Sequence, residues 1–100
     1  MTIQVQAPFQ VNEDMQALID EKVGKLEQYF DRITRVDLFF KITEKRHQRR
    51  EGKTVEIELH VPKTVLYADA QADAFEKALA DVTEKMRRQL LKYKKQMNNH

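Results

Sequence analysis

A long amphipathic segment near the C-terminus constrains the fold of this chain most strongly. From Asp73 to Met97 the apolar residues recur with the period of an α-helix. They fall on one side of a helical wheel, which predicts a helix of about six turns or more with a continuous apolar stripe. The stripe consists of Phe75, Leu79, Val82, Met86, Leu90, Tyr93 and Met97. Such a stripe needs a broad apolar partner, and the face of a β-sheet is one.

Four shorter segments alternate apolar and polar residues with period two, the pattern of strands with one face buried. They cover the residues up to Pro8, Val36–Thr43, Thr54–Val61 and Val65–Ala72. A stretch from Asn12 to about Phe30 has helical periodicity, and Asn12 followed by two acids is a typical helix start. This order predicts an α+β domain of topology β-α-β-β-β-α, in which a four-stranded mixed sheet has two helices packed on one face.

The composition limits the chemistry that the chain can carry. Its 100 residues fit one domain, which we place at residues 1–96 and follow with a short tail at 97–100. The absence of cysteine excludes disulfides, a thiolate nucleophile and cysteine-ligated metals. The histidines are scattered, and there is no glycine-rich phosphate loop. We therefore expect no enzyme activity, metal, cofactor or small-molecule substrate. No apolar run could span a bilayer, so we expect a cytoplasmic protein without membrane contact.

Positive charge concentrates in one run, although the net charge is only +2. The run contains Lys85, Arg87, Arg88, Lys92, Lys94 and Lys95, and no acid lies between them. Helical spacing puts Lys85, Arg88, Lys92 and Lys95 on one straight line, with Arg87 and Lys94 on the other flank. Cations near a helix C-terminus can simply complement the helix dipole. So many, with no acid to pair at i±4, repel one another and indicate a polyanionic partner such as nucleic acid.

Two further basic elements could extend this surface. Lys22 falls on the apolar side of the first helix, where it is either a lysine whose stem covers the core or, with Lys25, a cation in the groove between the helices. The segment Lys45–Lys53 is basic and glycine-containing, which indicates an exposed hairpin loop. That loop could contact phosphates, or it could serve only to keep the end of the hairpin soluble.

The outer face of the sheet looks unsuited to RNA. Phe39 and Tyr67 could stack on bases there, but acidic residues surround them on the same face. These acids are Asp37, Glu56, Glu58 and Asp69. Their charge would repel phosphate, so we expect this face to be solvated and held by cross-strand pairs.

Three segments of this sequence resemble the family of ribosome hibernation-promoting factors and ribosome-associated translation inhibitors. They are KVGKLEQYFDRI at Lys22–Ile33, VLYADA at Val65–Ala70 and KMRRQLLKYKK at Lys85–Lys95. The resemblance implies the same β-α-β-β-β-α fold and binding to the small ribosomal subunit in the channel for messenger and transfer RNA. Translation would then be inhibited by steric occlusion. The basic positions implied to face ribosomal RNA are Lys22, Lys25, Lys85, Arg88, Lys92 and Lys94, to which this chain adds Arg87 and Lys95.

The sequence departs from the family pattern at two places and leaves other functions open. Residues 73–80 read DAFEKALA, where the family often has an Asp-Met-Tyr-Ala-Ala-Ile-Asp-like stretch, and Ala7 and Pro8 replace a usual glycine. The resemblance is to a short form without the dimerisation domain of long members, which leaves open whether ribosomes are held as pairs or singly. Two alternatives remain: a general binder of structured RNA, and a protein-interaction module that regulates a transcription factor through the acidic sheet face.

Overall fold

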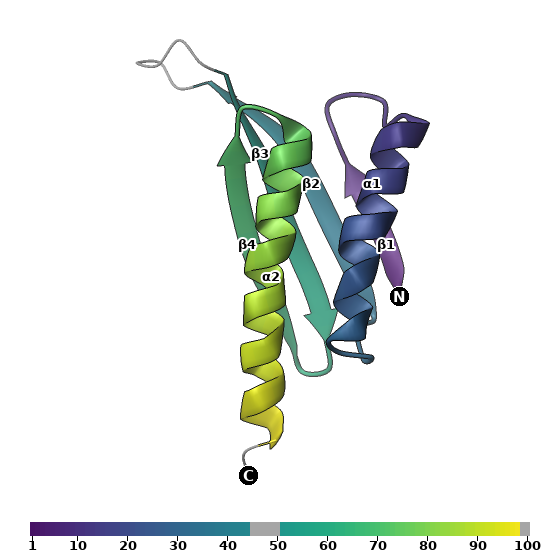
Figure 1. Cartoon of the computed structure of the whole chain (residues 1–100), viewed down its shortest axis with the longest axis vertical. Coiled ribbons are helices and arrows are strands. Elements are labelled where there is room, and N and C mark those ends of the chain that lie inside the picture. The colour runs from purple at the N-terminus through teal and green to yellow at the C-terminus, as the bar shows by residue number, and fades with distance from the viewer. Residues whose placement is uncertain (45–50, 99–100) are drawn as a thin grey trace.

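Two helices lie side by side on one face of a four-stranded sheet, and the other face is open (Figure 1). The computed structural model describes residues 1–44 and 51–98, with side chains for residues 1–42 and 52–97. In chain order the elements are β1 Thr2–Gln6, α1 Glu13–Gly24, the 3₁₀ helix η1 Lys25–Gln28, β2 Arg35–Glu44, β3 Glu51–Val61, β4 Thr64–Ala72 and α2 Phe75–Asn98. The predicted α+β class, element order and one-sided helix packing are confirmed.

The sheet has the order β1-β2-β3-β4, so neighbours in sequence are neighbours in space. β1 and β2 are parallel and are connected through α1, whereas β2, β3 and β4 form an antiparallel meander. The register aligns Val5, Leu38, Ile57 and Ala68 in one row across the four strands. Because side chains alternate between the faces of a sheet, this row and its equivalents form the apolar floor under the helices.

The core lies between this floor and the helices. Ile19 and Val23 of α1 and Leu79, Met86 and Leu90 of α2 have no exposed surface. The apolar stripe predicted for the C-terminal helix is therefore its buried side. Further along α2, the Tyr93 hydroxyl donates a hydrogen bond of 2.9 Å to the Pro62 carbonyl, and its ring packs edge-on against Phe30 at 5.5 Å. These contacts fix the rotation of α2 about its axis, and with it the direction of every charged residue on the helix.

The first helix starts where the sequence predicted but ends earlier. The Asn12 side chain accepts a hydrogen bond of 2.8 Å from the Met15 amide, as an N-cap should. The prediction of a helix to about Phe30 is wrong, because α1 ends at Gly24 and a 3₁₀ turn follows. Glycine is a weak helix former, and the tighter turn brings Leu26 and Phe30 into the core.

One expected core residue of the sheet is on the surface. Ile42 alternates with the buried Leu38 and Phe40 along β2, which predicts an inward side chain, but it is 49% exposed. Phe40 contacts the rings of Phe9 and Phe75 and is 3% exposed, whereas Ile42 lies further along the strand, beyond these contacts. Alternation predicts the side of a sheet to which a residue points, and only the tertiary structure decides whether anything covers it.

Two further predictions concern the basic hairpin loop and the C-terminal tail. The basic loop Lys45–Lys53 lies largely outside the described residues, which resume at residue 51. The division into a domain at 1–96 and a tail at 97–100 stays a prediction. α2 continues across that boundary to Asn98, and Met97 packs against the core.

Candidate nucleic-acid interface

The groove between α1 and α2 collects three of the predicted basic residues. Lys22 and Lys25 reach it from the first helix and Arg87 from the second, around a hollow of about 210 Å³. Arg87 lies over the ring of Tyr29, with its guanidinium carbon 6.0 Å from the ring centroid. Of the two interpretations of Lys22 and Lys25, the structure supports their placement in the groove between the helices.

The straight line of cations on α2 splits into two parts with different surroundings. Arg88, Lys92 and Lys95 are exposed, and the Arg88 side chain keeps 71% of its surface open to solvent. Lys85 instead donates a hydrogen bond of 2.8 Å to the Asp69 carbonyl on the outer edge of β4. Gln89, one turn further, donates at 2.6 Å to the Tyr67 carbonyl. Both side chains cap carbonyls of an edge strand, which gives Lys85 a structural contact of its own.

Lys94 lies in a separate, mixed environment near the end of α2. It lines a hollow of about 350 Å³ together with Arg32, Glu27 and Asp31. Acids and cations are equally numerous among the side chains that line this space, whereas cations outnumber acids in the groove. The structure thus brings Lys22, Lys25 and Arg87 together and lines up Arg88, Lys92 and Lys95, but it does not gather all the predicted site residues on one surface.

Glu84 is the one acid among the described residues that line the groove, and its pairing was not predicted from the sequence. Its carboxylate accepts hydrogen bonds from Arg87 at 2.9 Å (Nε) and 2.5 Å (Nη2), and it lies 3.5 Å from Nε of Arg88. The expectation that the basic run has no acid to pair with is therefore wrong. Glu84 precedes the run but reaches forward by one turn, at the spacings i+3 and i+4.

These contacts change the acid strengths of both partners. The hydrogen bond from Arg87 is the largest cause that lowers the pKa of Glu84, and the charges of Arg87 and Arg88 add to it. The same hydrogen bond raises the pKa of Arg87 above its ordinary value. Glu84 is thus ionised at neutral pH and neutralises part of the basic surface. Lys25 is similarly paired with Glu21 at 3.6 Å.

Two groove residues, Glu84 and Tyr29, were not predicted from the sequence. They differ in whether a local sequence pattern could have identified them. The spacing of Glu84 before Arg87 and Arg88 could have identified it as their partner, since i+3 and i+4 residues are neighbours on a helix. Tyr29 was assigned to the apolar side of the first helix. Its place under Arg87 depends on the packing of the two helices, which no local pattern encodes.

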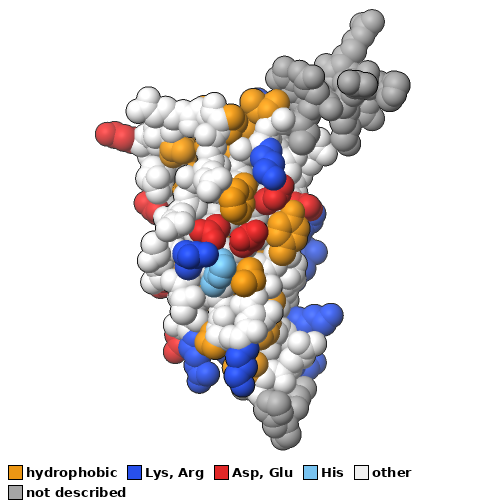
Figure 2. Space-filling model, turned by 180° about the vertical axis from the view of Figure 1, so that it is seen from behind, with side chains coloured by type: hydrophobic (Ala, Val, Ile, Leu, Met, Phe, Trp, Pro, Cys, Tyr) orange, Lys and Arg blue, Asp and Glu red, His pale blue; other side chains and the backbone are white. Residues whose placement is uncertain are grey.

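The open face of the sheet differs from the helix layer (Figure 2). Acidic side chains gather near its centre among hydrophobic ones, as the alternation of the strands predicted. Most of these acids have partners on the same face: Glu56 pairs with Lys41 at 2.8 Å, and Asp69 accepts a hydrogen bond of 3.2 Å from the Tyr67 hydroxyl. Lys41 and the Tyr67 hydroxyl are thus engaged by acids of their own face.

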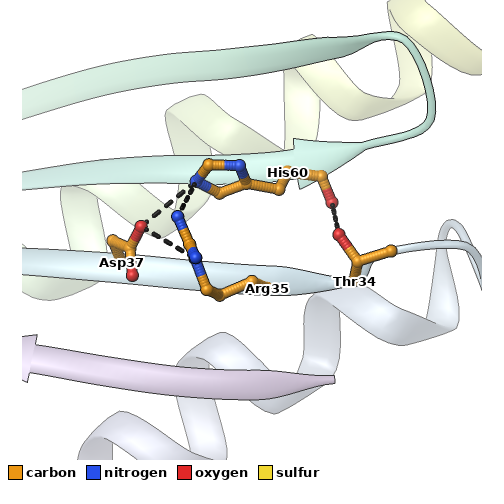
Figure 3. Close-up of polar contacts among 4 residues, drawn as sticks. All are labelled: Thr34, Arg35, Asp37 and His60. Atoms are coloured by element: carbon orange, nitrogen blue, oxygen red, sulfur yellow. Dashed lines mark hydrogen bonds and ion pairs between the residues drawn. The ribbon is translucent and has the colours of Figure 1, made fainter.

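The most buried of these acids is Asp37, which is 9% exposed (Figure 3). Arg35 donates to its carboxylate at 3.2 Å, and His60 lies 3.1 Å from the same oxygen. Ligand atoms of Asp37, Glu58 and His60 lie within 4.8 Å of one another, a group that could in principle hold a cation. The guanidinium of Arg35 contacts two of the three, so the cluster already contains a positive charge.

Comparison with known proteins assigns the chain to a family. Residues 3–98 match the family described as Sigma 54 modulation protein / S30EA ribosomal protein. The chain belongs to this family. Among S30EA relatives, the ribosome hibernation promoting factor of Escherichia coli K12 is 31% identical over 91 residues, which are 91% of this chain and 90% of that protein. The factor of the same name from Azotobacter vinelandii is 32% identical over 84% of this chain and 73% of that protein.

Solved structures show the same S30EA fold. A ribosomal subunit interface protein from Coxiella burnetii has a TM-score of 0.81 at 23% identity, covering 94% of this chain and 98% of the other. The N-terminal domain of Protein Y from Thermus thermophilus has a TM-score of 0.73 at 11% identity, covering 92% and 94%. Both sequence relatives are named as ribosome hibernation promoting factors. Neither α1 nor α2, the α-helices of the described part, is long and apolar enough to cross a membrane.

Proposed function

We propose that this protein is a ribosome hibernation factor that binds the small ribosomal subunit in the channel for messenger and transfer RNA. It acts in the cytoplasm, contacts ribosomal RNA through the helix layer and inhibits translation by occupying the channel. The mechanism has no chemical step and needs no cofactor. The observation that carries the proposal is the groove of Lys22, Lys25 and Arg87 beside the exposed line of Arg88, Lys92 and Lys95, in a family whose relatives are named for ribosome hibernation.

The helix layer suits a phosphate backbone for a geometric reason. Arg88, Lys92 and Lys95 form an exposed line on α2, and the groove adds an aromatic ring under the guanidinium of Arg87. Arginine and lysine side chains in such rows bind phosphate oxygens without reading the base sequence, which fits a partner recognised by its shape. Neutralising about five phosphates would give a log–log slope of binding against salt of roughly −3.5 to −4.5.

Sedimentation with ribosomes tests the proposal most directly. The test variant carries Arg88→Glu, Lys92→Glu and Lys95→Glu, which reverse the exposed line and leave Lys85 on the β4 edge. A matched control carries Arg32→Glu, Lys63→Glu and Lys77→Glu, which also reverse one arginine and two lysines at exposed positions. In sucrose gradients at low salt, wild type and control should migrate with small subunits. The test variant should bind about a hundredfold more weakly or worse.

Three outcomes would contradict the proposal in different ways. Wild-type protein that stays at the top of the gradient would exclude ribosome binding. A test variant that migrates like the control would show that the line on α2 is not the contact surface. Short RNA duplexes that compete as well as small subunits do would favour a general binder of structured RNA.

A further inference from the structure

Glu84 occupies the place and the hydrogen-bonding geometry that a phosphate group would take on this surface. Its two oxygens meet the fork of Nε and Nη2 of Arg87, and one of them also lies 3.5 Å from Arg88. Carboxylate and phosphate bind guanidinium groups through the same paired N–H donors. A phosphate that binds the fork of Arg87 must therefore replace Glu84, and a phosphate at Arg88 meets its negative charge.

The fold does not depend on this carboxylate. The Glu84 side chain is 46% exposed on the outer side of α2, while Met86 and Leu90 on the opposite side are fully buried and fix the helix. Arg87 has a second support, because its guanidinium lies over the Tyr29 ring. Removing the charge of Glu84 should therefore free both arginines and leave the helix packing as it is.

The position of Glu84 within the groove gives its charge a specific effect. The hollow is lined by the cations Lys22, Lys25 and Arg87, and Glu84 is the one described acid in that lining. On the solvent-facing side of α2, Lys92 and Lys95 have no charged or hydrogen-bonding partner among the described residues. The lysines are thus available to any polyanion, whereas the Nε–Nη2 fork of Arg87 becomes available only to a ligand that displaces Glu84, and Arg88 is partly neutralised by it.

We infer that Glu84 is an internal competitor of RNA phosphate, which holds Arg87 and Arg88 in the free protein and releases them only to a partner that engages both. Such a competitor lowers the affinity for ordinary polyanions, which contact the lysines alone. A partner whose phosphates reach the groove and the outer line together can offset this cost, because it contacts both arginines and the lysines. This inference rests on the proposed function for the identity of that partner, and on the geometry alone for the competition.

The decisive comparison is Glu84→Gln with Glu76→Gln, measured on the full chain with the single-stranded homopolymer poly(U) as probe. Both substitutions remove one negative charge from α2 at an exposed glutamate, but only Glu84 pairs with arginines. Glu84→Gln should tighten poly(U) binding about threefold to tenfold at low salt. It should also steepen the log–log salt slope by about 0.7 for each additional phosphate of the single strand that the arginines neutralise. Glu76→Gln should change the affinity by less than about twofold.

The same substitution in a background without the two arginines isolates the competition. In Arg87→Gln/Arg88→Gln protein, Glu84→Gln should give no tighter binding than Glu76→Gln does, because there is nothing left to release. Equal increases in affinity for Glu84→Gln and Glu76→Gln in the wild-type background would overturn the inference, since only overall charge would matter. Weaker binding by Glu84→Gln would overturn it too, because Glu84 would then position the arginines for RNA. Thermal melts check that all variants fold.

The poly(U) measurement separates this inference from the proposed function. Failure of wild-type protein to sediment with small subunits would overturn the proposed function and leave the poly(U) comparison intact. An unchanged poly(U) affinity of Glu84→Gln, with normal ribosome binding by wild type, would overturn the inference alone. If both hold, Glu84→Gln should increase the affinity for small subunits at least as much as the affinity for poly(U), because a partner that displaces the carboxylate no longer bears the cost of doing so.

Discussion

The helix layer and the open sheet face both carry charges of both signs, but they use them differently. On the sheet, Lys41 is paired with Glu56 at 2.8 Å and Arg35 with Asp37 at 3.2 Å. On the helix layer, several lysines have no charged or hydrogen-bonding partner among the residues that the structure describes. These are Lys22, Lys92, Lys94 and Lys95. The cations of the sheet face are paired with its own acids, whereas the helix layer keeps unpaired positive charge.

This difference in pairing indicates which face is available for binding. Charges on the sheet are brought together by strand register, which places Arg35 opposite His60 and Asp37 opposite Glu58. Their interactions are made when the sheet forms, so an incoming ligand adds little to them. The lysines on the helix layer are neutralised only when a ligand arrives, and the counterions released from that ligand then favour binding. Unpaired charge, more than total charge, marks the surface for a polyanion.

The largest effect expected from this comparison is stabilisation of the domain by a polyanion. Heparin at about 100 times its Kd should raise the free energy of unfolding by about 2.7 kcal/mol, because it binds the folded surface and not the dispersed charges of the unfolded chain. The Arg88→Glu/Lys92→Glu/Lys95→Glu variant should lose most of this stabilisation at the same heparin concentration. Urea denaturation with and without heparin measures it.

A sheet variant serves as the opposite test of the same comparison. Glu56→Gln, Glu58→Gln and Asp69→Asn together remove negative charge from the open face and leave the helices unchanged. This variant should keep the stabilisation by heparin close to that of wild type. An increase comparable in size to the loss on the helix layer would mean that the sheet acids control polyanion binding, and the distinction between the faces would fail.

The next effect concerns a single pair of acids on the sheet. Asp37→Asn should lower the free energy of unfolding by about 1 to 3 kcal/mol, because a buried carboxylate that accepts from Arg35 and contacts His60 is replaced by a weaker acceptor. The neighbour in the register, Glu58, provides the control. Its carboxylate has no ion pair or hydrogen bond within the described part of the chain, so Glu58→Gln should be neutral or slightly stabilising. Urea denaturation of both variants should therefore give opposite or clearly unequal changes, and equal losses would mean that the network around Asp37 contributes nothing.

Local patterns were sufficient to predict the architecture. The change from period two to period 3.6 at Asp73 identified α2 and its buried side, and Asn12 identified the start of α1. The two wrong predictions have different physical causes. α1 ends early at Gly24, and Ile42 is exposed because it lies beyond the ring contacts that cover Phe40.

The site was less predictable than the fold, for physical reasons that differ between residues. Glu84 and its arginines are close in sequence, so helical spacing already contained their pairing. The bond from Lys85 to the Asp69 carbonyl and the contact of Arg87 with Tyr29 join elements that are distant in sequence. Those contacts depend on the rotation of α2 and its distance from its neighbours, which tertiary packing sets. The sequence identifies the cations, but it does not show which of them form contacts within the fold.

The smallest expected effect is a shift in the titration of Tyr67 on the sheet face. Desolvation of its hydroxyl, the hydrogen bond to Asp69 and the charge of Glu56 raise the pKa of Tyr67 from its ordinary value of 10.0 to about 12. A raised pKa means that the folded state holds the proton more tightly. The resulting stability is complete below pH 10, and it is lost as the pH rises through about 12. Because Tyr67 is 46% exposed, solvent screening keeps this contribution small.

Absorbance titration of tyrosinate in wild type and in Tyr67→Phe checks this shift. The difference between the two curves should be a single step near pH 12. Asp69→Asn should move that step toward lower pH, since it removes a negative charge and replaces the acceptor of the hydroxyl hydrogen bond with a weaker one. A difference step near the ordinary pKa in wild type would mean that the acids of the sheet face do not act on Tyr67. The acids would then be less concentrated around the aromatic ring than the structure indicates, and their repulsion of phosphate, which separates this face from the helix layer, would be correspondingly weaker.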